Sequence, residues 1–279
     1  MTSSRLASSA QTQPAPSGPA RARPLADLRL VARQVRYEQL TFWLNPVGAV
    51  FTVGFSLVFL ILLGAIAGSS RVNFLGHIKL IQYYVPGFVA YGVMSACFNT
   101  LTMVLVNRRE TGLLKRLRLS PLPTWALLGA IFVSTLLVAF VQVIIMVAVG
   151  RLAFGVELPS NMGAFVLAVV VGGISFTAMG AAMSTVIPNQ DAAGPVTSIV
   201  FFILLFLSGL WFPIQPGSGL AKFSAYFPIR HFITAVFAPF DSVKGVSPWA
   251  WHDLLVIGIW GVAGCVIAVW RFNWSPRRN

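Results

Sequence analysis

The sequence predicts an all-α, polytopic membrane protein with six transmembrane helices, and three observations lead to this prediction. Hydrophobic residues make up 57% of the 279 residues and charged residues only 10%, against roughly 25% charged residues in an average soluble domain. Six apolar stretches have about the length that a helix needs to cross roughly 30 Å of hydrocarbon, and none carries a charge or a histidine near its middle. Unbroken apolar runs also lack the alternation of barrel strands, so helices are expected. The stretches are 47–67, 85–106, 125–150, 162–187, 196–212 and 254–270.

The positive charges predict the orientation of these helices. Fourteen of the 20 Lys and Arg residues lie before the first span, between the second and third, or after the last. Because cytoplasmic loops are enriched in Lys and Arg, both termini are expected in the cytoplasm, with residues 273–279 as a short tail. The net charge of +13 also fits nucleic-acid binding, but the basic residues are divided among several loops and form no single face.

The residues before the first span divide into a tail and a helix. Residues 1–24 are rich in Pro, Ser, Ala and Gln and cannot bury enough apolar area to fold, so a disordered cytoplasmic tail is expected. Residues 25–45 carry apolar side chains at spacings of three and four, with Arg29, Arg33 and Arg36 on a neighbouring face. This pattern predicts an amphipathic interfacial helix. Such a helix either anchors the chain to anionic headgroups or belongs to a docking platform for a cytoplasmic partner.

The basic loop at 107–124 is the best candidate for that platform. Glu110 is expected in the first turn of a short helix, where its charge meets the positive end of the backbone dipole. Leu113, Leu114 and Leu117 share one face of this helix, and a following Ser-Pro-x-Pro run ends it. The alternative is an ordinary cytoplasmic loop with solvated charges.

The region between the fifth and sixth spans, 214–252, is expected to stay outside the cell. Its apolar part, 221–240, is interrupted by two prolines and by Lys222 and Arg230. Short re-entrant or interfacial outer helices are therefore expected, and a seventh span is the rival interpretation. Aromatic residues near the outer surface form either a gate or an interfacial belt. The candidates for the outer gate are Trp211, Phe212, Pro213 and Phe227.

Polar side chains inside the spans are few, and they are the candidates for a translocation path. Interhelical hydrogen bonding is the alternative use of such groups. A path lined by apolar groups, hydroxyls and amides suits a hydrophobic or amphiphilic cargo, because an ionic one would meet no compensating charge. No metal site is expected, because the three histidines are dispersed along the outer loops. The main path candidates are Asn99, Thr102, Ser134, Gln142, Thr177 and Ser198.

The sequence contains no motor of its own. The phosphate-binding pattern Gly-x-x-x-x-Gly-Lys-Ser/Thr does not occur in it. Its seven acidic residues lie in loops or at span ends, whereas proton relays need ionisable groups within the membrane. The chain is therefore expected not to be an enzyme, to carry no cofactor, and to take its energy from another subunit.

Two motifs give the sequence a family resemblance. The segment Arg109-Glu-x-Gly-x-x-Lys-Arg-Leu-Arg-x-Ser-Pro121 resembles the cytoplasmic loop of the type-2 permeases of ATP-binding-cassette (ABC) exporters, a family that includes the daunorubicin-resistance permeases. The run Leu207-Ser-Gly-Leu-Trp-Phe-Pro213, followed by Phe227-Pro-Ile-Arg-His231, resembles the same family. With the order of the six spans, the resemblance covers residues 25 to 272.

The resemblance implies a permease subunit whose transmembrane domain, 46–272, works with other chains in the plasma membrane. It implies a separate ABC ATPase in two copies, which holds the ATP and Mg²⁺, and a second permease subunit, identical or not. It also implies that the loop at 107–124 couples to the ATPase. The residues assigned to this coupling are Arg109, Glu110, Gly112, Arg116 and Pro121.

The expected function is export of a hydrophobic or amphiphilic molecule, either a drug-like compound or a lipid. A permease for a lipid-linked glycan is one alternative, and a channel or scaffold that needs no ATPase is another. A membrane-embedded enzyme would need converging carboxylates, histidines or an activated nucleophile, and the sequence indicates none. The partners expected are therefore the ATPase, a second permease and membrane lipids, with no nucleic acid.

Overall fold

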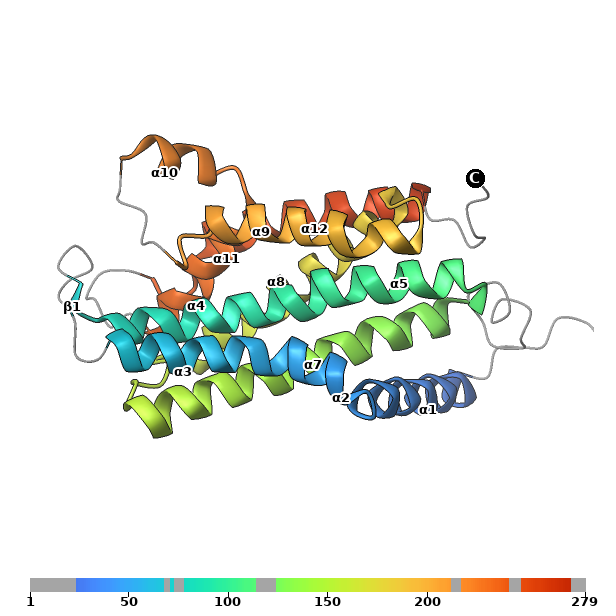
Figure 1. Cartoon of the computed structure of the whole chain (residues 1–279), viewed down its shortest axis with the longest axis horizontal. Coiled ribbons are helices and arrows are strands. Elements are labelled where there is room, and N and C mark those ends of the chain that lie inside the picture. Colours follow the sequence, from blue (N-terminus) through green and yellow to red (C-terminus); the bar gives the residue numbers. More distant parts are fainter. Residues whose placement is uncertain are drawn as a thin grey trace, which may run out of the picture.

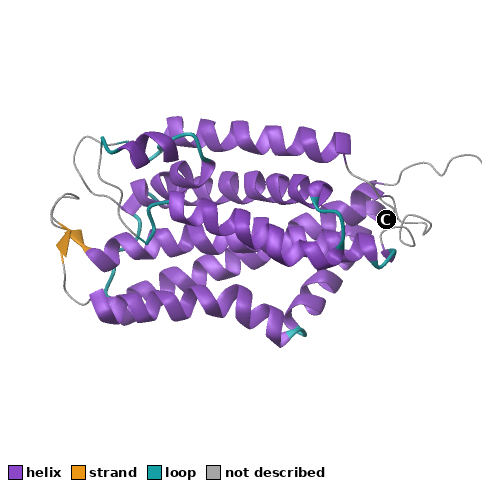
Figure 2. Ribbon diagram, turned by 45° about the horizontal axis from the view of Figure 1, so that its top comes forward, coloured by secondary structure: helices purple, strands orange, loops and turns teal. Residues whose placement is uncertain are grey.

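The computed structural model describes residues 24–67, 71–72, 78–113, 124–211, 217–240 and 247–271, which form a bundle of long helices (Figures 1 and 2). Six helical segments are long and apolar enough to cross a bilayer, so the six predicted spans are confirmed. The segments are Pro46–Ile66, Leu80–Glu110, Trp125–Phe154, Met162–Val186, Gln190–Leu207 and Trp251–Arg271.

Several spans are built from more than one element. A π-helical segment, η1, separates α2 from α3 in the first span, and a second one, η3, separates α4 from α5 in the second. The spanning elements are α2 (Pro46–Ala49), η1 (Val50–Gly54), α3 (Phe55–Ala67), α4 (Leu80–Met94), η3 (Ser95–Thr100), α5 (Leu101–Glu110), α7 (Thr124–Phe154), α8 (Met162–Val186), α9 (Gln190–Leu207) and α12 (Trp251–Arg271). The remaining elements are α1 (Pro24–Trp43), α10 (Gly219–Ser224), α11 (Pro228–Phe237), η4 (Ala238–Phe240) and the strands β1 (Arg71–Val72) and β2 (Ile78–Lys79).

The fold class is correct apart from one short hairpin. Strands β1 and β2 pair antiparallel over two residues each, and the other elements of the described chain are helical. The predicted helix at 25–45 is present as α1, and α10 and α11 follow the fifth span as short helices. Whether these three helices lie at the membrane surface stays a prediction.

The fifth span lies closer to the N-terminus than predicted, and its caps explain the shift. The Asn189 side chain accepts a hydrogen bond from the Ala192 amide at 2.9 Å and so caps α9, which begins at Gln190. At the other end the helix stops at Leu207, and Gly209 adopts a φ of +80°, which glycine tolerates best. The prediction of 196–212 followed hydropathy alone and missed both signals. Trp211 therefore lies beyond the helix.

The bundle has two distinct ends in Figure 1. Helix α1, the end of α5 and the end of α12 lie at one of them, called the α1 end here, and β1 and α10 lie at the other, called the α10 end. The segments that the charge pattern assigned to one side of the membrane are thus together. Which end faces the cytoplasm stays a prediction.

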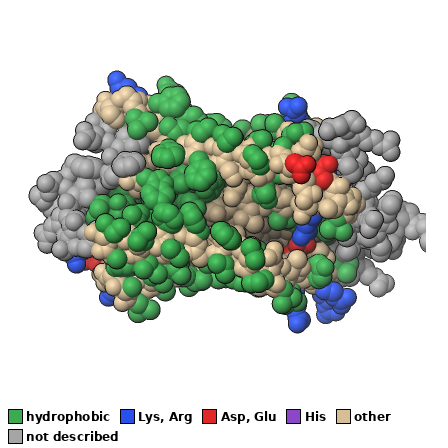
Figure 3. Space-filling model, viewed as in Figure 1, with side chains coloured by type: hydrophobic (Ala, Val, Ile, Leu, Met, Phe, Trp, Pro, Cys, Tyr) green, Lys and Arg blue, Asp and Glu red, His purple; other side chains and the backbone are tan. Residues whose placement is uncertain are grey.

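The second span forms the centre of the bundle. Every residue of Tyr84–Phe98 is buried, and α4 contacts α3, α7, α8 and α11. A helix that is apolar on all sides is expected to be surrounded by other helices in this way. Figure 3 shows the complementary feature of the exterior, where hydrophobic side chains cover the middle of one face and charged ones lie toward the ends.

Helices α8 and α12 approach closely along a row of small residues. A Cβ atom placed on Gly261 would lie 2.5 Å from Ser175 Oγ, and one on Gly264 would lie 2.9 Å from the Met179 backbone nitrogen. Small residues such as Gly261 thus let the two helices pack closely. The row continues through Gly264 and leaves Cys265 exposed, because the helix turns that position away from α8.

Candidate functional site

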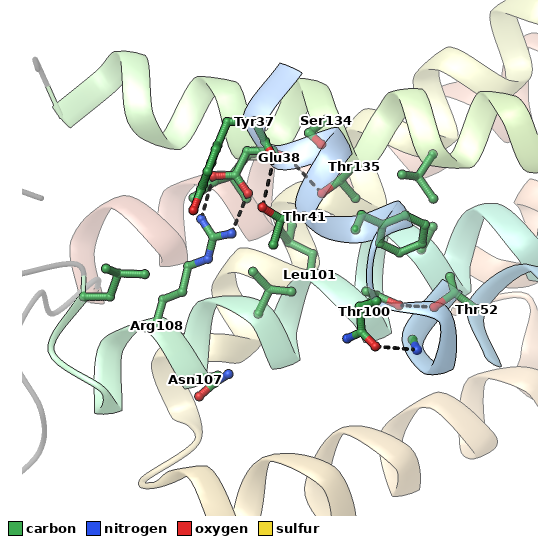
Figure 4. Close-up of a pocket in the computed structure, with 18 of the residues that line it drawn as sticks. Tyr37, Glu38, Thr41, Thr52, Thr100, Leu101, Asn107, Arg108, Ser134 and Thr135 are labelled. Atoms are coloured by element: carbon green, nitrogen blue, oxygen red, sulfur yellow. Dashed lines mark hydrogen bonds and ion pairs between the residues drawn. The ribbon is translucent and has the colours of Figure 1, made fainter. Parts of the chain in front are cut away.

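A cavity of about 650 Å³ opens near the α1 end, between α1, α5 and α7 (Figure 4). Residues of α2, η1 and η3 complete its wall. The lining combines hydroxyl and amide groups, such as Thr41, Thr135 and Asn107, with apolar side chains such as Leu101 and Val138. A cavity of this size and mixed lining can hold a small amphiphilic molecule.

An ion pair forms part of the cavity wall. In Figure 4 the Arg108 guanidinium on α5 reaches Glu38 on α1, with N–O distances of 2.8 and 2.5 Å. Gln34 Nε2, one turn earlier on α1, donates to the same carboxylate at 3.0 Å. The pair is bidentate, and the Glu38 side chain is only 6% exposed. It therefore holds α1 against α5 through a largely desolvated contact.

A second polar contact fixes α1 to α7. Gln39 Nε2 donates to both the carbonyl and the hydroxyl oxygen of Ser134, at 2.7 and 2.8 Å. Ser134 also lines the cavity. Helix α1 is thus attached on both sides of the cavity, by Glu38 and by Gln39, and any movement of α1 changes the width of the opening.

The two π-helical segments meet at the cavity wall. Thr52 of η1 and Thr100 of η3 both line the cavity, and their hydroxyl oxygens lie 3.4 Å apart. Short π-helical insertions occur often at functional sites. Behind them, Gln142 of α7 donates to the Thr52 carbonyl at 3.1 Å and to Ser56 Oγ at 2.7 Å. Its Oε1 atom is buried and has no hydrogen-bond partner among the described residues.

The predicted path residues are spread through the bundle. Ser134 is the one that lines the cavity among the six, within the part of the chain that the structure describes. Gln142 lies behind the cavity wall, against Thr52 and Ser56. Thr102 donates to the carbonyls of Phe98 and Gly180 and so links α5 to α8. Thr177 is buried, whereas Asn99 and Ser198 are half-buried.

Arg109 is buried inside the α1 end of the bundle. It donates to the Ser184 and Ile187 carbonyls at 3.0 and 2.8 Å, at the end of α8, and to Glu110 Oε1 at 2.7 Å. The last carbonyls of a helix lack partners within it, and a cation is favoured there. The Arg109 side chain therefore caps α8 and joins it to the end of α5.

The start of the predicted coupling loop differs from the expectation. Glu110 is the last residue of α5, so it is not in the first turn of a separate helix. Gly112 follows with a φ of +69°, the conformation in which glycine commonly ends a helix. Arg116 and Pro121 lie outside the described residues, as does most of the predicted short helix.

The predicted outer gate is described only in part. Trp211 packs edge-on against Phe59 and Phe88, with ring centroids 5.2 and 6.3 Å away. Phe227 contacts Phe223, with centroids 5.3 Å apart. Phe212 and Pro213 lie outside the described residues. Trp211 and Phe227 thus contact different aromatic neighbours.

Two of the three histidines are close together, so they are not dispersed as the sequence suggested. The rings of His231 on α11 and His252 on α12 have centroids 5.7 Å apart, and Asp253 adjoins both. The third, His77, lies outside the described residues. The expectation was wrong because it considered only the separation of the histidines in the sequence. In the fold, α11 and α12 pack against each other at the α10 end.

The ion pair between Glu38 and Arg108 was not recognised from the sequence. The two residues are 70 positions apart, and each fits a simpler interpretation as a charge at the membrane surface. The available signal was that Glu38 lies near the end of α1 that enters the first span, where a buried carboxylate calls for a positive partner.

Comparison with known proteins places the chain among membrane transport proteins. Residues 76–270 match a family described as ABC-2 family transporter protein. The chain is 26% identical over 151 residues to the probable multidrug ABC transporter permease YbhR of Escherichia coli (strain K12), a match of 54% of this chain and 41% of that protein. It is 22% identical over 177 residues to the putative transport permease YvfS of Bacillus subtilis (strain 168), covering 63% and 70%. The chain thus spans less than half the length of YbhR.

Proposed function

The chain belongs to the ABC-2 family of transporter proteins, and on that premise we propose that it exports an amphiphilic molecule with energy from a separate ATPase. The observation that carries the proposal is the cavity between α1, α5 and α7, with its mixed polar and apolar lining. The cavity takes up cargo from the inner half of the membrane, since the charge pattern favours a cytoplasmic α1 end.

The polar groups of the cavity favour a cargo without net charge. Glu38 and Arg108 neutralise each other, so an ionic cargo would find no free counter-charge among the described lining residues. Hydroxyl and amide groups such as Thr41, Thr100 and Asn107 can hydrogen-bond a neutral or zwitterionic headgroup. The apolar part of the lining suits a hydrocarbon chain. A single-chain zwitterionic lipid or a drug of similar amphiphilic shape fits this description.

The end of α5 is proposed to receive the movement of the ATPase. The surface for this contact is the segment that follows, with Glu110, Gly112, Arg116 and Pro121. Arg109 has a different part in the proposal, because its guanidinium is bound to the carbonyls at the end of α8. A displacement of the loop by the ATPase would move α8, because Arg109 binds the end of that helix. The same displacement would shift α5 relative to α1, to which Arg108 binds. The same movement would change the width of the cavity.

The opening of the cavity offers a direct test of cargo binding. Thr41 lines the cavity and is exposed on α1, so a tryptophan in its place would fill the opening. We expect Thr41→Trp to weaken the binding of a fluorescent lysophosphatidylcholine by at least about tenfold, which is about 1.4 kcal/mol. Binding would be measured by fluorescence with the purified protein in lipid nanodiscs.

A matched control is available on the same helix. Leu40 is 50% exposed and does not line the cavity, so Leu40→Trp adds a similar ring outside it. This variant is expected to bind the probe as the unchanged protein does. Equal affinity in Thr41→Trp and Leu40→Trp would show that the cavity is not where the cargo binds.

A further inference from the structure

A cluster of ligand-type side chains lies at the α10 end, opposite the cavity. His231 on α11 and His252 and Asp253 on α12 bring one ligand atom each to within 4.8 Å of one another. The proposed transport function uses none of the three. We propose that they bind one divalent transition-metal ion, with Zn²⁺ as the best match, and that this ion fastens α11 to α12.

The orientation of the His231 ring supports metal binding. The side chain is mostly buried, and Nε2 lies 2.8 Å from the Ala225 carbonyl oxygen, which can only accept a hydrogen bond. Nε2 must therefore carry a proton. Metal-binding histidines are commonly held in this way, with the second ring nitrogen donating to a carbonyl or carboxylate. Nδ1 then points at Asp253. After it loses its proton, this nitrogen can bind a metal ion.

The metal would replace a proton between two of the ligands. His231 Nδ1 and Asp253 Oδ1 are 2.6 Å apart, so a hydrogen-bonding proton lies between the two atoms. A Zn²⁺ ion with ligand distances of about 2.0–2.1 Å would hold the same two atoms about 3.3 Å apart in tetrahedral geometry. A separation of this size needs only a small movement of α11 and α12.

The third ligand and the charges around the site complete the argument. His252 is exposed, so its ring can turn toward the ion, and the site remains open to solvent. Two imidazoles and a carboxylate suit Zn²⁺ and similar ions better than Ca²⁺ or Mg²⁺, which prefer oxygen ligands alone. The neighbouring Arg230 is bound to the Ala221 carbonyl and to Ser224.

Titration of the purified full chain with ZnCl₂, after removal of any histidine tag, tests the proposal. Calorimetry should give one Zn²⁺ ion per chain, and Co²⁺ in its place should give the visible absorption of a tetrahedral complex. We expect His252→Ala and Asp253→Asn each to lower the affinity by more than tenfold, because loss of a ligand exceeds the loss of about 10–100-fold caused by its supporting partners. Since His252 is exposed, His252→Ala leaves the fold intact.

An exposed carboxylate outside the cluster provides the matched control. Asp191 lies in the first turn of α9, so Asp191→Asn should bind Zn²⁺ as the unchanged protein does. Saturating Zn²⁺ should raise the thermal unfolding midpoint of the unchanged protein and of Asp191→Asn, but not that of His252→Ala. The proposal is overturned if no ion binds stoichiometrically, if His252→Ala binds as well as the unchanged protein, or if Asp191→Asn is weakened as much. None of these results bears on export.

Discussion

Replacing Arg109 with alanine is expected to lower the free energy of unfolding by about 3–5 kcal/mol, the range for removing one member of a buried charged pair. Only 3% of Arg109 is exposed. Its loss would leave Glu110 without its partner and the Ser184 and Ile187 carbonyls without a donor at the end of α8. This total already includes the cost of each abandoned buried group, which is about 1–3 kcal/mol. Lysine should rescue little, because one ammonium group cannot reproduce the fork of the guanidinium.

Denaturant titration of the purified variants in detergent would measure this effect. Arg151→Ala is the matched control, because Arg151 is exposed at the end of α7 and donates one hydrogen bond of 3.3 Å, to the Val156 carbonyl. The control substitution is expected to lower the free energy of unfolding by no more than about 1 kcal/mol. If Arg109→Ala proved as stable as Arg151→Ala, Arg109 would not join α5 to α8, and the proposed route for the movement would lose its first step.

The second large effect is expected at the ion pair between α1 and α5. Glu38→Leu and Arg108→Leu should each lower the free energy of unfolding by about 3–5 kcal/mol, because each leaves a largely buried charge uncompensated. The double variant should be close to the unchanged protein, since well-packed apolar residues often replace a buried pair at little cost.

The same three variants separate stability from cargo binding. The measurements are a double-mutant cycle on unfolding and the affinity for the fluorescent lysolipid. In the double variant we expect near-normal stability but altered affinity, because Glu38 and Arg108 form part of the cavity wall. If the double variant lost as much stability as the two single variants combined, the pair would not be coupled, and the contact in the structure would not hold α1 in place.

The six spans could be predicted because a bilayer imposes a simple requirement of length and apolarity on each helix. The start of α9 could not be found in this way, since it depends on the Asn189 side chain that caps the helix. The same applies to Glu110, which closes α5 because Gly112 adopts a positive φ. Hydropathy contains no information on such local hydrogen bonds and backbone angles.

The site was harder to predict than the fold, because its contacts join residues far apart in the sequence. Glu38 meets Arg108 and Gln39 meets Ser134 only when α1 folds back along the bundle. His231 lies next to His252 only because α11 packs against α12. Ser134 was found because a polar residue inside an apolar span is conspicuous. Arg108 resembled any other charge at a membrane surface.

The central proposal is that a separate ATPase moves this chain, whose sequence does not contain the phosphate-binding pattern Gly-x-x-x-x-Gly-Lys-Ser/Thr. The most direct test uses the purified chain in sealed vesicles with fluorescent lysophosphatidylcholine, before and after addition of the ATPase that we expect to co-purify with it from membranes. With ATP or a pH gradient alone, we predict no directional transport, and with the ATPase and ATP together, accumulation of the probe on one side. ATP-driven or pH-driven transport by the chain alone would contradict this account.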